Sequence, residues 1–282
     1  FYSQQQTIPP PGIITRLMIP FLLILFLFIA IVLNHLYLWK PGDVSLFYNG
    51  NSPLWFAHRG ASTVAPENTI SAYTQAIKSG MPALEIDVIR TLDGVLLCSH
   101  NFDLERKTDY GGYIDELPYA RIKDANTALN WNSKKEGLPK LEDVLKIVPK
   151  HVRLNIEIKS RSFHDISAVR DVIELIKGKK FINKTIISSF NPLVIWYVKW
   201  INPHVWTGFL YKNLDYFFMI NVVHPDCLHT RAELVSKNLV KFAKQRGFAL
   251  NIWTVNTKPA IDWLIDLKVD GIITDRIEFL PN

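Results

Sequence analysis

The stretches LWFAHRG at residues 54–60 and ALEIDVIR at residues 83–90 decide the fold predicted for this chain. The first is a short apolar run that ends on His58, and the second alternates between apolar and polar side chains. Because successive side chains of a β-strand point to opposite faces, Glu85 and Asp87 share one face. At about 4 Å and an effective dielectric of about 20, two such carboxylates repel each other by roughly 4 kcal/mol. A hard divalent cation relieves this repulsion, so the pair predicts a metal site.

Two further segments carry polar groups of the same kinds. VLLCSH at residues 95–100 is an apolar strand that ends on a histidine, and RLNIEIK at residues 153–159 alternates. In the alternating segment, Glu157 and Lys159 face the same way. We expect Glu157 to be a third oxygen ligand and Lys159 a positive charge beside it. Carboxylates, cationic side chains and two imidazoles suit metal-assisted phosphoryl chemistry, in which the imidazoles transfer protons.

The remainder of the chain alternates between strand-like and helix-like segments, which indicates a parallel sheet. The later strands are expected at Arg153–Ile158, Lys184–Ser189, Val205–Leu210, Met219–Val223, Ala249–Val255 and Gly271–Thr274. Helices are expected at Asn68–Lys78, Leu141–Val148, Ile166–Ile176, Leu193–Trp200, Arg231–Gln245 and Pro259–Leu267. Residues 102–138 interrupt this alternation of strands and helices, because they are rich in Asp, Lys, Gly and Asn.

Eight short motifs follow one another along the chain. They are His58-Arg-Gly60, Pro66-Glu-Asn-Thr69, Glu85-Ile-Asp87, Thr91-Leu-Asp-Gly94, Ser99-His100, Glu157-Ile-Lys159, Trp253-Thr-Val-Asn256 and Asp270-Gly-Ile-Ile-Thr-Asp275. Their order resembles that of the glycerophosphodiester phosphodiesterase family. The resemblance implies an α/β fold, a (β/α)₈ TIM barrel with a small insertion at about 102–138. It also implies an enzyme, a phosphoric diester hydrolase.

The resemblance further implies a role for each matching residue. Glu85, Asp87 and Glu157 would bind one divalent cation, Ca²⁺ or Mg²⁺. His58 and His100 would be the acid–base pair, Arg59 and Lys159 would lie near the phosphate, and Trp253 would line the pocket. The products would be glycerol 3-phosphate and an alcohol. One departure is visible, because the family usually has Asp after its second histidine and this chain has Asn101.

Two other functions stay open. The same site could act as a lysophospholipase D, releasing the head group of a lysophospholipid or another lipid-linked phosphodiester. A barrel kept only for binding is the second alternative, and the complete set of candidate ligands and histidines argues against it. A serine hydrolase is disfavoured, because Ser188-Ser189 lacks the Gly-x-Ser-x-Gly turn.

The N-terminal part of the chain has the composition of a membrane helix. Residues 17–33 carry no charge, and the apolar stretch continues to Trp39. As a helix, residues 17–39 would be about 34 Å long, enough to cross a hydrocarbon core of about 30 Å. We expect an anchor rather than a cleaved signal peptide, because the run is long and no small-x-small cleavage site follows it.

We expect four regions: a flank at 1–16, the transmembrane helix at 17–39, a linker at 40–53 and the barrel at 54–282. The charges flanking the helix, Arg16 and Lys40, are nearly balanced, so they favour neither orientation. We take the catalytic domain to be extracytoplasmic. After residue 52 the chain has 30 basic and 25 acidic side chains, a balance that favours anionic substrates and membrane surfaces. We expect no nucleic-acid partner, because no basic-aromatic stripe is present.

Overall fold

The computed structural model describes residues 11–50, 53–131 and 134–281. The chain divides into two units, Phe1–Trp39 and Lys40–Asn282. Of the expected flank, residues 1–10 lie outside the described part.

The first unit is one long apolar helix. Helix α1 spans Pro11–Leu33, and a π-helical turn continues it over Asn34–Leu38. Within it, Met18–Leu38 has a mean hydropathy of 2.6 and none of this window is buried. By length and composition the helix could cross a membrane, and a signal sequence near the N-terminus has the same properties.

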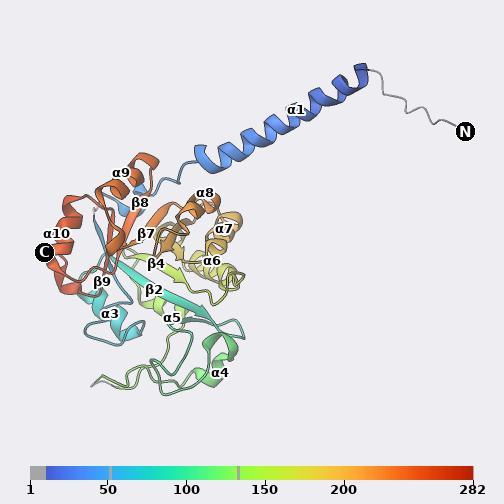
Figure 1. Cartoon of the computed structure of the whole chain (residues 1–282). Helices are drawn as coiled ribbons and strands as arrows, with labels where there is room; N and C mark the ends of the chain where they lie inside the picture. Colours follow the sequence, from blue (N-terminus) through green and yellow to red (C-terminus); the bar gives the residue numbers. More distant parts are fainter. Residues whose placement is uncertain (1–10, 51–52, 132–133, 282) are drawn as a thin grey trace, which may run out of the picture. The chain divides into compact units, whose positions relative to one another are not determined.

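The second unit is a closed barrel of eight parallel strands (Figure 1). They are β1 Leu54–Ala57, β2 Ala83–Arg90, β4 Arg153–Ile158, β5 Thr185–Ser189, β6 Trp206–Tyr211, β7 Cys227–Arg231, β8 Ala249–Trp253 and β9 Gly271–Thr274. Strand β1 closes the barrel, because it pairs in parallel with both β9 and β2. This is the predicted TIM barrel, in which the carboxyl ends of the strands carry the active face.

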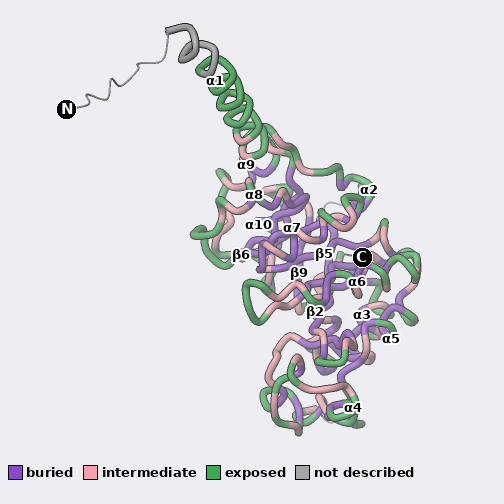
Figure 2. Tube along the Cα trace, turned by 90° about the vertical axis from the view of Figure 1, so that its right-hand side faces the viewer, coloured by how far each residue is buried: buried purple, intermediate pink, exposed green. Residues whose placement is uncertain are grey.

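Helices cover the outside of the barrel (Figure 1). They are α3 Ile70–Lys78, α5 Leu141–Ile147, α6 Ala168–Gly178, α7 Pro192–Ile201, α8 Ile220–Val223, α9 Lys237–Arg246 and α10 Lys258–Asp266. Local sequence sets several starts: the side chains of Thr69, Asn191 and Ser236 each accept a backbone hydrogen bond from the first turn of a helix. The interior of the barrel is almost entirely buried (Figure 2).

Two expected segments are wrong. Met219–Val223 was expected to be a strand, but the chain there forms a 3₁₀ turn at Phe217–Met219 followed by helix α8. The barrel strand in this part of the chain is β7, which begins eight residues further on. Its sequence CLHTR is less apolar than Met219–Val223, so the sequence pattern did not predict it. The helix expected at Arg231–Gln245 begins only at Lys237, because β7 still includes Arg231 and a 3₁₀ turn occupies Ala232–Leu234.

The strand that carries His100 to the active face is not one of the parallel barrel strands that the alternation of strands and helices predicted. Strand β3, Leu96–Cys98, is antiparallel to β2 and lies outside the ring of eight. This hairpin returns the chain towards the barrel, so that the Ser99 amide donates to the Asp87 carbonyl over 3.2 Å. The following segment contains a 3₁₀ turn at Ile114–Glu116 and helix α4, Tyr119–Ile122, with its own apolar cluster. It corresponds to the expected insertion.

The expected linker at 40–53 is partly built into the barrel. Within it, helix α2 spans Ser45–Tyr48 and buries Phe47 and Tyr48. These rings join a core cluster that includes residues at the amino ends of the strands, such as Leu54 and Ala249. The segment therefore closes the floor of the barrel as well as connecting it to the N-terminal helix.

Candidate active site

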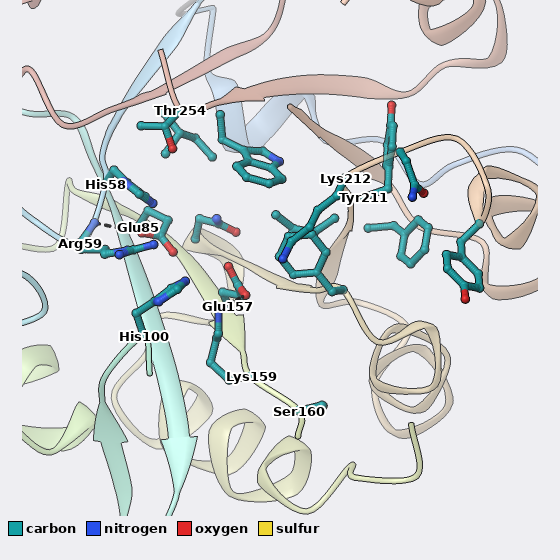
Figure 3. Close-up of a pocket in the computed structure, with 18 residues that line it drawn as sticks. His58, Arg59, Glu85, His100, Glu157, Lys159, Ser160, Tyr211, Lys212 and Thr254 are labelled. Atoms are coloured by element: carbon teal, nitrogen blue, oxygen red, sulfur yellow. Dashed lines mark hydrogen bonds and ion pairs between the residues drawn. The ribbon is translucent and has the colours of Figure 1, made fainter. Parts of the chain in front are cut away.

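A cavity of about 610 Å³ opens at the carboxyl ends of the barrel strands. Seven of the eight predicted site residues line it, namely His58, Arg59, Glu85, His100, Glu157, Lys159 and Trp253. The eighth, Asp87, lies beside them in the acidic cluster. Figure 3 shows His58, His100, Glu85 and Glu157 pointing towards one common space.

Three acidic side chains converge from two adjacent strands. In the register of β2 against β4, Asp87 pairs with Glu157 and Glu85 pairs with Asn155. Ligand atoms of Glu85, Asp87 and Glu157 all lie within 4.8 Å of one another, and all three residues are buried. The strand alternation read from the sequence therefore does bring these three carboxylates together.

The three carboxylates differ in how readily they ionise. Burial, together with Asp87 and Glu157 nearby, raises the pKa of Glu85 well above its ordinary value. Burial also raises the pKa of Glu157, although Lys159 opposes this effect. Burial acts in the same direction on Asp87, but Lys159 and Arg59 together hold the pKa of Asp87 below its ordinary value. Without a cation, the trio thus favours retaining a proton on Glu85.

Two cationic side chains flank the trio. Lys159 Nζ lies 2.7 Å from Glu157 Oε1 and 3.5 Å from Asp87 Oδ1. Arg59 Nε lies 3.1 Å from Asp87 Oδ2, and the Arg59 amide donates to Glu85 Oε2 over 2.9 Å. Burial would lower the pKa of Lys159, yet the carboxylates of Glu157 and Asp87 raise it above its ordinary value. Both side chains therefore keep their charge at neutral pH.

The imidazole of His58 contacts a carboxylate that was not among the predicted site residues. His58 Nδ1 lies 2.7 Å from Asp275 Oδ1, just after the end of β9. Asn256 and Ser62 also donate to this carboxylate, over 2.6 Å and 3.0 Å. Burial would raise the pKa of Asp275, but the hydrogen bond from His58 and these donors lower it to about 2. Asp275 is therefore ionised and orients His58.

His100 has a neutral partner instead. His100 Nδ1 lies 3.0 Å from Asn101 Oδ1, and an amide oxygen only accepts, so Nδ1 carries the proton. Burial lowers the pKa of His100 to about 4, although the Asp87 carboxylate acts in the opposite direction. His100 is consequently a neutral imidazole at pH 7, with Nε2 unprotonated.

The acidic trio fits a divalent cation. Asp87 Oδ1 and Asn155 Oδ1 are buried, and neither accepts a hydrogen bond from any residue in the described ranges. Asn155 also lines the cavity. Buried oxygen atoms that accept no hydrogen bond, beside two further carboxylates, are the ligand chemistry that Mg²⁺ and Ca²⁺ require.

The opposite wall of the cavity is aromatic and apolar. Phe190 and Trp253 pack edge to face, with ring centroids 5.6 Å apart. The Trp253 indole donates to the His229 carbonyl over 2.9 Å, which orients the ring. Lys212 Nζ lies 5.0 Å from the centre of the Phe190 ring. Phe209, Leu210, Tyr211 and Tyr216 complete this wall.

Sequence reasoning missed several residues of the site. Asn68, quoted only as part of a motif, donates to Asp87 Oδ2 over 3.0 Å and accepts from the Asp87 amide over 3.2 Å, which orients this carboxylate. Phe190, directly after β5, was not among the predicted site residues, and it lines the cavity. Apart from Trp253, the residues of the aromatic wall belong to no predicted motif, because they come from the ends of different strands. The one sequence signal for this wall was the position of Phe190 directly after a predicted strand.

Comparisons with known proteins agree with this geometry. A model of the glycerophosphoryl diester phosphodiesterase family matches residues 58–279. A glycerophosphodiester phosphodiesterase of Caldanaerobacter subterraneus is 34% identical over 234 residues, which cover 81% of this chain and 96% of the relative.

Solved structures show the same fold. A phosphodiesterase of Oleispira antarctica, solved in complex with the product sn-glycerol-3-phosphate, has a TM-score of 0.74 at 23% identity, covering 81% of this chain and 95% of that chain. A glycerophosphodiester phosphodiesterase of Parabacteroides distasonis has a TM-score of 0.70 at 27% identity, covering 80% and 94%. Because the family model spans nearly the whole barrel and the bacterial relative is similar along its own length, this chain belongs to the glycerophosphoryl diester phosphodiesterase family.

Proposed function

We propose that this protein hydrolyses glycerophosphodiesters to glycerol 3-phosphate and an alcohol. The observation that carries the proposal is the buried trio Glu85, Asp87 and Glu157, whose ligand atoms lie within 4.8 Å of one another. His58 and His100 line the same cavity. A cation site between two imidazoles has the groups that phosphodiester cleavage needs, namely positive charge at the phosphate and two proton carriers.

The trio would hold one divalent cation, Ca²⁺ or Mg²⁺. When bound, such a cation supplies positive charge that stabilises a phosphoryl oxygen as negative charge develops on it. Arg59 and Lys159 line the cavity beside the trio and keep their charge, so they would bind the remaining phosphoryl oxygens. Trp253, on the facing wall, would contact the alcohol portion of the substrate.

The partners of the two histidines favour different roles. His100 is neutral and its unprotonated Nε2 can take a proton, so it would be the general base for the attacking hydroxyl. His58 is held at Nδ1 by the carboxylate of Asp275, the arrangement by which an acid–base histidine is oriented, so it would donate a proton to the leaving alcohol. The attacking hydroxyl would be that of water or the 2-hydroxyl of the substrate's glycerol.

The activity test uses the purified full chain with glycerophosphocholine. We expect release of glycerol 3-phosphate and choline, loss of this activity in excess chelator, and recovery on adding Ca²⁺ or Mg²⁺. Release of phosphocholine and glycerol would show that the other ester bond is cleaved and would contradict the proposal. Full activity in chelator would contradict the role of the cation.

A second candidate substrate is a lysophospholipid, which the aromatic wall of the cavity favours. Phe190, Leu210 and Trp253 offer an apolar surface that glycerophosphocholine would not use. We expect a higher kcat/KM for lysophosphatidylcholine than for glycerophosphocholine if this wall binds an acyl chain. A kcat/KM for lysophosphatidylcholine equal to or lower than that for glycerophosphocholine would favour the short diester as the substrate.

We also propose that Met18–Leu38 anchors the protein in a membrane, with the barrel outside the cytoplasm. The support is the length and hydropathy of this helix. Alkaline carbonate should leave the full chain in the membrane pellet, and protease added to intact cells should digest the barrel. Release into the supernatant would contradict the anchor, and protection from protease would contradict the orientation.

A further inference from the structure

Exposed apolar side chains gather on one side of the barrel. On α7, Trp196 and Trp200 stack with ring centroids 5.8 Å apart and are 45% and 73% exposed. Helix α7 contacts α8, which lies next to it (Figure 1). We call this side the aromatic face; its members are Trp196, Trp200, Leu214, Tyr216, Phe218 and Val222, all exposed.

The aromatic face stands out from the rest of the surface. Its four aromatic residues are more than half of the seven exposed aromatic side chains in the described part of the barrel. Isolated exposed apolar residues are ordinary, but several such residues gathered on adjacent elements point to a binding surface. Trp and Tyr are also the residues that membrane proteins place at the level of the lipid head groups.

The segment that leads from the N-terminal helix leaves the barrel beside this face. The Gly42 amide donates to Asp226 Oδ1 over 2.8 Å, and Asp226 Oδ2 forms an ion pair with Lys199 of α7. Trp206 Nε1 donates to the Asp43 carbonyl over 3.0 Å. Lys199 directly precedes Trp200, so these contacts fix the exit of the chain at the carboxyl end of α7.

The covalent connection from this exit to the candidate membrane span is short. Four peptide units separate Leu38, the last residue of the span, from Gly42. Fully extended, they reach about 14 Å. Whatever angle the span makes with the barrel, a span in a bilayer therefore keeps the carboxyl end of α7 close to the membrane surface.

The other end of the aromatic face reaches the cavity. Tyr216 belongs to the face, is 64% exposed, and also lines the cavity. Lys212, four residues earlier, is exposed and lines the cavity as well. The aromatic face thus extends from the point where the chain enters the barrel to the opening of the active site. Lys212, at the cavity end of the face, adds a positive charge that suits an anionic lipid surface.

We propose that the aromatic face lies on the lipid bilayer in which the N-terminal helix is anchored, so that the active-site opening is at the level of the lipid head groups. The proposal rests on the membrane anchor put forward above. Trp200 and Phe218 would enter the interfacial layer of the bilayer. Helix α3 would face away from the membrane, because it lies on the opposite side of the barrel from α8 (Figure 1).

The test measures the proximity of single residues to lipid in the full chain, reconstituted into vesicles of phosphatidylcholine and phosphatidylglycerol. Both native cysteines are buried, so a cysteine introduced at the surface can be labelled selectively with a fluorophore. The labelled variants are Trp200→Cys and Phe218→Cys. Their controls are Gln75→Cys, exposed on α3, and Trp263→Cys, an exposed tryptophan site on α10. Lipids carrying a nitroxide at the head group serve as quenchers.

We expect loss of fluorescence at positions 200 and 218 and no loss at 75 and 263. A label at Phe28→Cys, in the middle of the span, should be quenched by lipids with the nitroxide deep in the acyl chain. If Phe28 is quenched and positions 200 and 218 behave like Gln75, docking of the face is refuted while the anchor stands. If Phe28 is not quenched, the anchor fails and this proposal fails with it, whereas phosphodiesterase activity would be unaffected. If the labels at positions 200 and 218 escape quenching by lipid but show energy transfer between two copies of the chain, the face binds a protein partner and the proposal is overturned.

Discussion

At the scale of single residues, the two histidines of the cavity differ in the group that holds Nδ1. Asp275 carries a charge and Asn101 does not, although each lies within 3.0 Å of its histidine. A carboxylate stabilises an imidazolium, whereas an amide only orients the ring. This difference makes the two histidines chemically distinct, and it supports the assignment of His58 as the acid and His100 as the base.

The assignment predicts different responses to the leaving group. His58→Ala and His100→Ala should each reduce kcat on glycerophosphocholine by at least about 100-fold, the usual contribution of a general acid or base. With p-nitrophenol as the leaving alcohol, His58→Ala should recover most of its activity, because a good leaving group needs no proton. His100→Ala should stay impaired. Steady-state kinetics with both substrates gives the answer, and the reverse pattern would exchange the two roles.

Asn101 should tune the pH dependence. In Asn101→Asp, a carboxylate beside Nδ1 would favour protonated His100 and raise its pKa from about 4. A base works only when neutral, so the acidic limb of the kcat/KM profile should move to higher pH. Asn213→Asp adds the same charge to the cavity lining and serves as the control. An acidic limb that moves equally in both variants would show that His100 is not the group observed.

At the scale of elements, the short helix α2 couples the N-terminal segment to the barrel. Phe47 is fully buried and packs on Phe56 and Trp206, with ring centroids 6.2 Å and 5.6 Å away. Tyr48, beside it, donates to Asn251 Oδ1 over 2.9 Å in the barrel interior. The floor of the barrel is therefore made from residues that precede its first strand.

This packing predicts a large cost for Phe47→Ala. Removing a buried phenylalanine ring destabilises a core by about 3–5 kcal/mol. Leu46→Ala, in the same helix at a residue that is 77% exposed, is the control and should change stability by no more than about 0.5 kcal/mol. Urea unfolding of the purified chain in detergent compares the two free energies of unfolding. Equal effects would mean that α2 is a loose tether rather than part of the core.

The sequence predicted elements well where alternation was strong, and failed where it was weak. The alternating polar residues of β2 and β4 placed Glu85, Asp87 and Glu157 on one face, and the structure has them together. The strand β7 contains His229 and Thr230, both buried, so its composition gave no apolar signal. Asp275 could not be assigned, because its contact with His58 joins residues 217 positions apart.

At the scale of the whole molecule, barrel closure creates the site. Strands β1 and β9 pair, and this pairing sets His58 beside Asp275. Strands β2 and β4 pair, and this pairing sets Asp87 beside Glu157. The sequence could predict which residues end each strand, but the aromatic wall and the aromatic face depend on how distant segments pack around the ring.

The central claim is that Glu85, Asp87 and Glu157 together bind the divalent cation on which activity depends. The most direct measurement is a crystal of the protein grown with Mn²⁺, in which anomalous diffraction locates the metal. We predict a single strong peak among these three carboxylates, lost in Glu157→Gln, with Mg²⁺ competing for the site. A peak elsewhere in the cavity, or its persistence in Glu157→Gln, would contradict the account.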